Sequence, residues 1–264
     1  MWTRETLKMN GKNTMNRNYW IFVLAALVLM LIGGETLNYN VNLDVNAGPV
    51  VTVEGIDVVG GDAVNDAIDS GLLSAYDTMT NINSNGIISW MLGSLAAGLA
   101  ILVASLSILI KVFVGGPMSV GIRNAFLKGQ STKVEAKEIL AAFKGSTYLN
   151  VVLIQFLRGL FTTLWTLLLV IPGIVKYYEY RMIPYLLAEN PNMDRRTAFQ
   201  ISKQMMDGQK MDTFVLDLSF ILWHMLSGIT FGIAGIFYVG PYVESTNAQL
   251  YLALKANGAN YEHL

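Results

Sequence analysis

Residues 167–187 read LLLVIPGIVKYYEYRMIPYLL, and this stretch decides the fold class. An apolar run meets Pro172 and Gly173, and a second apolar run follows. A Pro-Gly pair between two such runs indicates a hairpin bend, with the proline in the first turn of the second helix. The second run carries three ionisable residues, Lys176, Glu179 and Arg181. Because ionisable side chains are costly in lipid and tend to face other helices or water, the stretch predicts a polytopic membrane protein with a polar interior.

The composition supports the same fold class and argues against several kinds of chemistry. The chain has 264 residues, of which 53% are hydrophobic and 14% charged, whereas soluble domains average about 25% charged residues. The net charge of −1 gives no general attraction to nucleic acid. There is no cysteine, and His224 and His263 are the only histidines, so thiolate chemistry and histidine-rich metal sites are not expected. We therefore predict a protein that is not an enzyme, with no catalytic, cofactor-binding or metal-binding residues.

Six apolar segments predict an all-α polytopic membrane protein with about six transmembrane helices. The predicted spans are residues 20–32, 87–114, 147–171, 172–189, 214–230 and 241–255. The first is read as a retained helix and not a cleaved signal peptide, because no small-x-small cleavage site follows it. The last is polar for lipid, with Glu244 near its start and four further polar residues after it. It is therefore either shielded by the other helices or placed at the interface.

The distribution of charge predicts the orientation. Residues 18–110 contain no Lys or Arg but eight acidic residues, whereas residues 111–146 contain six Lys or Arg and two acidic residues. Positive residues are retained in the cytoplasm, so both termini are predicted to be cytoplasmic, in a multi-pass protein of the plasma membrane.

This orientation divides the chain into three parts. Residues 1–34 form a cytoplasmic tail and the first transmembrane helix, residues 35–86 an acidic extracytoplasmic insert, and residues 87–264 a helical bundle. The cytoplasmic loops of the bundle are residues 115–146 and 189–212.

Two segments outside the spans have recognisable local patterns. Residues 40–45 and 50–58 alternate polar and apolar side chains around a turn, which predicts a β-hairpin in the insert. Residues 62–80 have apolar positions near helical spacing, which predicts a short helix. Residues 194–208 read as an amphipathic cytoplasmic helix that Gly208 terminates.

The carboxy-terminal half also resembles a known family. The ordered set consists of LLLVIPGIVKYYEYRMIPYLLAENP, then A-x-x-x-S-K-x-M-M-x-G-x-K from Ala198, FVLDLSFILW from Phe214, GPY from Gly240, and Tyr251. With Gly115, Gly116, Pro117, Gly121 and Arg123, it resembles the integral-membrane family of Gram-positive bacteria called domain of unknown function 975, over roughly residues 110–255. The resemblance implies a membrane fold and no activity.

Seven ionisable residues are the candidate intramembrane polar groups: Arg158, Lys176, Glu179, Arg181, Asp217, His224 and Glu244. Depths counted at about 1.5 Å per residue place Arg158 with Asp217, Lys176 with Glu244, and Glu179 with His224. These residues could form a polar pathway, or they could be structural pairs that fix the helix register.

The sequence leaves two functions open. The first is a non-enzymatic, partner-binding or envelope- and export-associated membrane protein. Its expected partners are the lipid bilayer and a membrane or export-machinery protein, with no nucleic acid. The alternative is a small transporter or channel with a polar intramembrane pathway.

Overall fold

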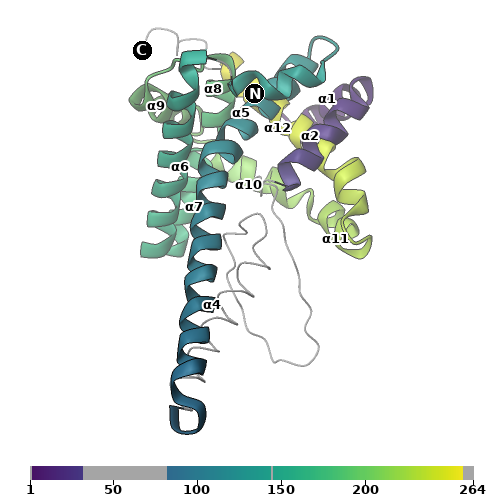
Figure 1. Cartoon of the computed structure of the whole chain (residues 1–264). Helices are drawn as coiled ribbons and strands as arrows, with labels where there is room; N and C mark the ends of the chain where they lie inside the picture. The colour runs from purple at the N-terminus through teal and green to yellow at the C-terminus, as the bar shows by residue number, and fades with distance from the viewer. Residues whose placement is uncertain (1, 32–81, 144, 258–264) are drawn as a thin grey trace. The chain divides into compact units, whose positions relative to one another are not determined.

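The computed structural model describes residues 2–31, 82–143 and 145–257, and every secondary-structure element in these ranges is a helix (Figure 1). The predicted all-α fold is therefore confirmed for this part of the chain. The predicted β-hairpin at residues 40–58 and the predicted short helix at residues 62–80 lie outside the described residues.

The chain divides into two compact units, residues 43–113 and residues 1–42 with 114–264. The described part of the smaller unit is dominated by α4, Ile82–Ile110, a helix of 29 residues without an ionisable side chain. At about 1.5 Å per residue, α4 is longer than the ~30 Å hydrocarbon core of a bilayer. The helix continues through the π-helical turn η1, Lys111–Gly115.

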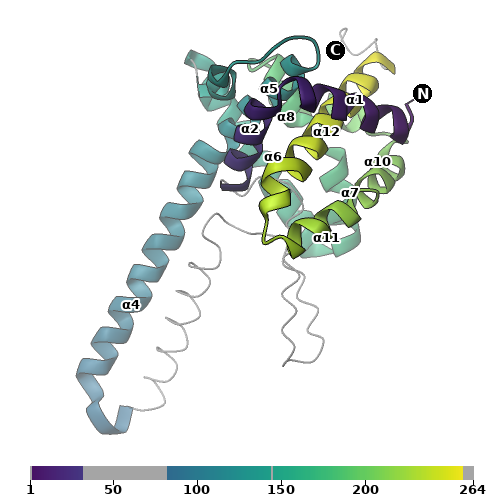
Figure 2. The same cartoon turned by 90° about the vertical axis from the view of Figure 1, so that its right-hand side faces the viewer.

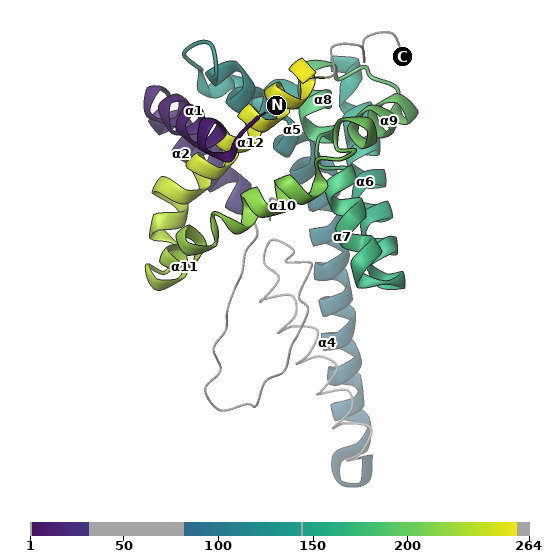
Figure 3. The ribbon, with the colours of Figure 1, turned by 180° about the vertical axis from the view of Figure 1, so that it is seen from behind.

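The larger unit contains the other helices. They are α1 (Arg4–Arg17), α2 (Tyr19–Leu31), α5 (Gly116–Gly129), the 3₁₀ helices η2 (Ala136–Phe143) and η3 (Gly145–Thr147), α6 (Tyr148–Leu168), α7 (Val170–Glu179), α8 (Ile183–Glu189), α9 (Arg195–Met205), α10 (Lys210–Leu218), α11 (Ile221–Ile229), the π-helix η4 (Gly235–Val239) and α12 (Gly240–Asn257). Figure 1 shows α6 and α7 as an antiparallel pair, which is the hairpin predicted at Pro172. Figure 3 shows α10 followed by α11, with a bend between them.

Within the described residues, three helical segments are long and apolar enough to cross a membrane. They are Gly93–Gly129, Gly145–Leu168 and Lys210–Ile229, and the bent pair α1–α2 is a fourth if it counts as one span. The predicted spans at residues 172–189 and 241–255 are not among these segments. The first is interrupted between α7 and α8, and the second corresponds to the polar helix α12.

Residues 4–17, which we expected to be a tail, form α1 and meet α2 at an angle of 105°. Asn18 holds this corner with its side chain. Its amide nitrogen donates to the carbonyl oxygens of Gly129 at 3.1 Å and Thr132 at 3.2 Å, and its amide oxygen accepts from the Val134 N–H at 3.1 Å. The corner is thereby fixed to the segment that follows α5.

Helix α12 lies inside the larger unit, and most of its side chains from Pro241 to Leu254 are buried. Helix α1 lies against it (Figure 2). A Cβ atom at Gly11 of α1 would lie 2.9 Å from the backbone nitrogen of Thr246, so the glycine allows the two helices to approach closely. Within the larger unit, this polar helix is therefore covered by other helices.

The helices α6, α7 and α11 expose many large apolar side chains. Leu167, Ile171 and Ile229, for example, are 84%, 76% and 75% exposed. Exposed apolar surface of this extent suits helices that face lipid and not water.

Candidate functional site: two charge clusters and an open cavity

The helix is interrupted between α7 and α8, and a side chain from another helix forms hydrogen bonds with the backbone at this break. Ser202 of α9 is fully buried. Its hydroxyl donates to the Glu179 carbonyl at 2.6 Å and accepts from the Met182 N–H at 3.3 Å. Ser202 thus supplies hydrogen bonds to backbone groups at the break, where a continuous helix would have used its own. This explains physically the serine in the A-x-x-x-S pattern.

The first group of buried charges, the aspartate cluster, consists of Tyr178, Arg181, Asp217 and Asn247. The guanidinium of Arg181 binds both carboxylate oxygens of Asp217, at 2.5 and 2.8 Å. It also donates to the Asn247 side-chain oxygen at 2.9 Å, and the Tyr178 hydroxyl donates to Asp217 at 2.8 Å. Paired bonds of this kind are among the strongest in proteins. The cluster joins the α7–α8 break to α10 and α12.

The second group, the glutamate cluster, consists of Lys176, Glu179 and Lys210. The carboxylate of Glu179 is buried, and each of its oxygens has a lysine partner. The ammonium of Lys176 lies 2.6 Å from one oxygen, and that of Lys210 lies 2.8 Å from the other. The cluster therefore links α7 to the start of α10.

The predicted pair of Arg158 with Asp217 was wrong, because both oxygens of Asp217 are bound by Arg181. Arg158 instead donates through Nε to the carbonyl oxygen of Tyr180 at 2.9 Å. Pro184 has no N–H and cannot bond that carbonyl as a residue of a regular helix would. The depth estimate failed because it assumed straight helices, whereas the break places Arg181 against α10.

The partners predicted for Lys176 and Glu179, which were Glu244 and His224, were also wrong. Lys176 and Glu179 bind each other, one turn apart on α7. Glu244 of α12 accepts a hydrogen bond from the Tyr185 hydroxyl at 3.5 Å. His224 lies on α11.

A cavity of about 510 Å³, which the sequence did not predict, lies between α5, η2, α8 and α12. Most of its lining is apolar, and three polar side chains, Asn124, Lys128 and Glu189, contribute to it. One wall depends on Gly121 of α5, where a Cβ atom would overlap the carbonyl oxygen of Ile139 in η2. The glycine was part of the family pattern, but a lone glycine does not reveal a cavity.

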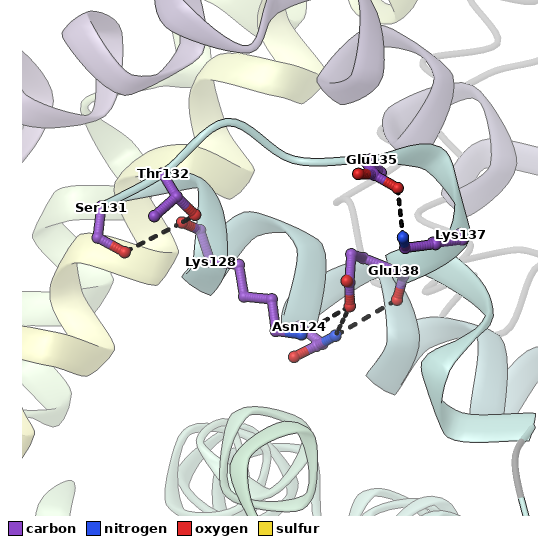
Figure 4. A network of polar contacts seen from close by, with 7 residues as sticks. All are labelled: Asn124, Lys128, Ser131, Thr132, Glu135, Lys137 and Glu138. Atoms are coloured by element: carbon purple, nitrogen blue, oxygen red, sulfur yellow. Dashed lines mark hydrogen bonds and ion pairs between the residues drawn. The ribbon is translucent and has the colours of Figure 1, made fainter.

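The α5 side of the cavity carries a small polar network (Figure 4). Glu138 of η2 accepts from the Lys128 ammonium at 2.7 Å and from the Asn124 amide nitrogen at 3.3 Å. The hydrogen bond from Lys128 lowers the pKa of Glu138 below its ordinary value. Nearby, Lys137 and Glu135 pair at 2.5 Å, and the hydrogen bond that Lys137 donates to the Glu135 carboxylate raises the pKa of Lys137.

The opposite side of the cavity is formed around Glu189, at the end of α8. One carboxylate oxygen, Oε2, accepts from the Tyr251 hydroxyl at 2.8 Å and from the Lys255 ammonium at 2.6 Å. Both partners lie on α12, and the Tyr251 ring stacks on Tyr185 of α8 with centroids 5.3 Å apart. These contacts fix the position of the carboxylate at the cavity.

Comparison with known proteins finds one family match, in the carboxy-terminal part of the chain. Residues 167–258 match the family "Protein of unknown function (DUF975)". The match confirms the resemblance found in the sequence over this range, while residues 110–166 lie outside it. The DUF975 region contains both charge clusters and Glu189, and the α5 wall of the cavity lies before it. No curated protein and no solved structure matches the chain.

Proposed function

We propose that this protein is a non-enzymatic membrane protein that acts by binding a protein partner at the end of its bundle that carries the cavity. We place this end in the cytoplasm, in a plasma-membrane protein with six spans and cytoplasmic termini. In this arrangement α7 with α8 forms a broken fourth span, and α12 is a sixth span shielded from lipid. An envelope- or export-associated protein is the proposed partner.

The observation that carries this proposal is the pairing of the buried acids. Both oxygens of Asp217 and both oxygens of Glu179 are bound by cationic side chains of the same chain. A polar pathway requires ionisable groups that exchange with water or solute, and such groups mark the routes of transporters. Here the pairing favours a structural role. At the cavity, in contrast, both donors to the Glu189 carboxylate bind the same oxygen, Oε2.

A crosslinking experiment tests the proposal. A photoreactive amino acid replaces Leu252, which lines the cavity, and a control replaces Leu167, which is 84% exposed on the apolar surface of α6. Irradiation of cells should give a discrete protein adduct at position 252 and not at position 167. The same partner should co-purify in mild detergent. Repeated recovery of the protein alone, or solute flux through reconstituted liposomes that Glu179→Gln abolishes, would support the transporter instead.

The proposed orientation has its own test, which uses the absence of native cysteine. A cysteine at Asp66 should react with an impermeant thiol reagent added to intact cells, after any layer outside the plasma membrane has been removed. A cysteine at Lys133 or Lys203 should react only after lysis, because both positions are proposed to be cytoplasmic. Labelling of position 133 in intact cells would reverse the orientation and move the cavity to the outer side.

A further inference from the structure

Two oxygen atoms at the cavity have no hydrogen-bond donor among the described residues. Asn124 is 9% exposed, and its amide nitrogen is used by Glu138. Its amide oxygen points away from Glu138 (Figure 4). The second atom is Oε1 of Glu189, because Tyr251 and Lys255 both bind Oε2. Both residues line the cavity, the buried Asn124 from α5 and the exposed Glu189 from the end of α8.

The chemistry of the lining specifies the kind of ligand. Two acceptor oxygens favour a ligand that donates hydrogen bonds, and the carboxylate favours a ligand that carries positive charge. An anion would meet the Glu189 carboxylate, and the nearby Lys128 ammonium is already bound by Glu138. Because Lys255 neutralises part of the Glu189 charge, recognition depends on hydrogen bonds as well as on charge.

The rest of the lining is apolar and includes Val120, Leu127, Leu187 and Leu252. Such a wall suits an alkyl chain. The volume of about 510 Å³ falls within the ~300–1,000 Å³ typical of small-ligand sites. A primary ammonium supplies three donors in a small volume, and an attached alkyl chain covers the apolar wall.

We propose that this cavity binds a primary alkylammonium group, with its nitrogen between Asn124 Oδ1 and Glu189 Oε1. The same chemistry occurs in a lysine side chain of a protein partner and in a free alkyl amine. The inference rests on the proposed function for the first of these sources, since a partner's lysine would then be the anchor of the complex.

The test uses the full chain in detergent and isothermal titration calorimetry with n-hexylammonium. Hexylammonium should bind, whereas 1-hexanol and hexanoate, which have the same chain without the cation, should not. Glu189→Gln should weaken binding at least tenfold, and Glu135→Gln, which removes the same charge from the exposed pair outside the cavity, should leave it unchanged. Ala188→Leu, which narrows the cavity and keeps every charge, should also weaken binding.

A second arm separates the two sources. The end-blocked tripeptide leucyl-lysyl-leucine is compared with the same peptide carrying an acetylated lysine amine. Tighter binding of the unmodified peptide than of hexylammonium assigns the cavity to a lysine of a partner, and weaker binding assigns it to a free amine. Failure of wild-type protein to bind either probe, or equal binding by Glu189→Gln, overturns the inference. The crosslink at Leu252 still tests partner binding independently.

Discussion

The aspartate cluster and the cavity differ in how many of their polar atoms have a hydrogen-bond partner. In the cluster, Arg181 binds both oxygens of Asp217, and further donors and acceptors come from Tyr178 and Asn247. At the cavity, one oxygen of Glu189 is bound and the other has no donor among the described residues. A saturated network fixes the positions of helices, whereas an unsaturated one at an open cavity can hold a ligand. The buried charges of the aspartate cluster are therefore less suited to binding a ligand than the carboxylate of Glu189.

The largest expected effect comes from dividing the aspartate cluster. Arg181→Leu or Asp217→Leu alone leaves a buried charge without its partner, which costs roughly 3–5 kcal/mol. The double substitution removes both charges and should recover much of that loss. Thermal unfolding in detergent measures each variant.

The control for this cycle is the pair that the sequence suggested. Arg158→Leu and Asp217→Leu should lower stability additively, because Arg158 binds the carbonyl of Tyr180 and Asp217 binds Arg181. If the losses of stability for Arg181→Leu and Asp217→Leu add, the two residues do not stabilise the fold as a pair. The contrast between a saturated cluster and an unsaturated cavity would then be wrong.

An intermediate effect is expected at the α7–α8 break. Ser202→Ala removes the hydroxyl that binds the Glu179 carbonyl and the Met182 N–H, and a buried polar group left without a partner costs about 1–3 kcal/mol. The matched control is Ser131→Ala, where an exposed hydroxyl donates to the carbonyl of Lys128. The control should unfold at nearly the wild-type temperature. If Ser202→Ala does so too, the break does not depend on α9.

The smallest effect is expected at the polar network beside the cavity. The pKa of Glu138 is lowered in the folded protein, so its stabilising contribution is present above the unfolded pKa of about 4.3 and is lost as the pH falls. For a pair at the surface this amounts to about 1 kcal/mol or less. Melting between pH 3 and 7 should show a slightly steeper acid loss in wild type than in Glu138→Gln. Identical profiles would mean that the contact with Lys128 contributes nothing.

The sequence predicted the elements whose signals are local. Apolar runs and Pro172 gave the α6–α7 hairpin, and residues 194–208 gave α9, with Asp194 as its N-cap and Gly208 at a positive φ of 69° after its end. These features depend on residues close together in the chain, so patterns of composition and spacing are sufficient to find them.

The features that the sequence missed depend on contacts between distant helices. Pro184 was read as part of a continuous span, because nothing near it shows that Ser202 will bind the backbone at a break. The break places Arg181 against Asp217, and an estimate of depth along straight helices could not identify this pair. The cavity joins residues from four elements. Asn124 belongs to no recognisable motif, and Glu189 lies in the quoted family pattern, which does not show that the two residues line one cavity.

The burial of α12 bears on how the protein is made. Helix α12, with 18 residues, is more polar than a membrane span of that length, and a translocon admits helices largely according to hydropathy. It is also synthesised after every other described helix, although α1 and α2 pack against it. We therefore expect the earlier helices to wait in the membrane as an incomplete bundle, and α12 to enter by binding to them and not by dissolving in lipid. On the proposal that α12 is a sixth, shielded span, membrane insertion and tertiary folding are one step for this helix.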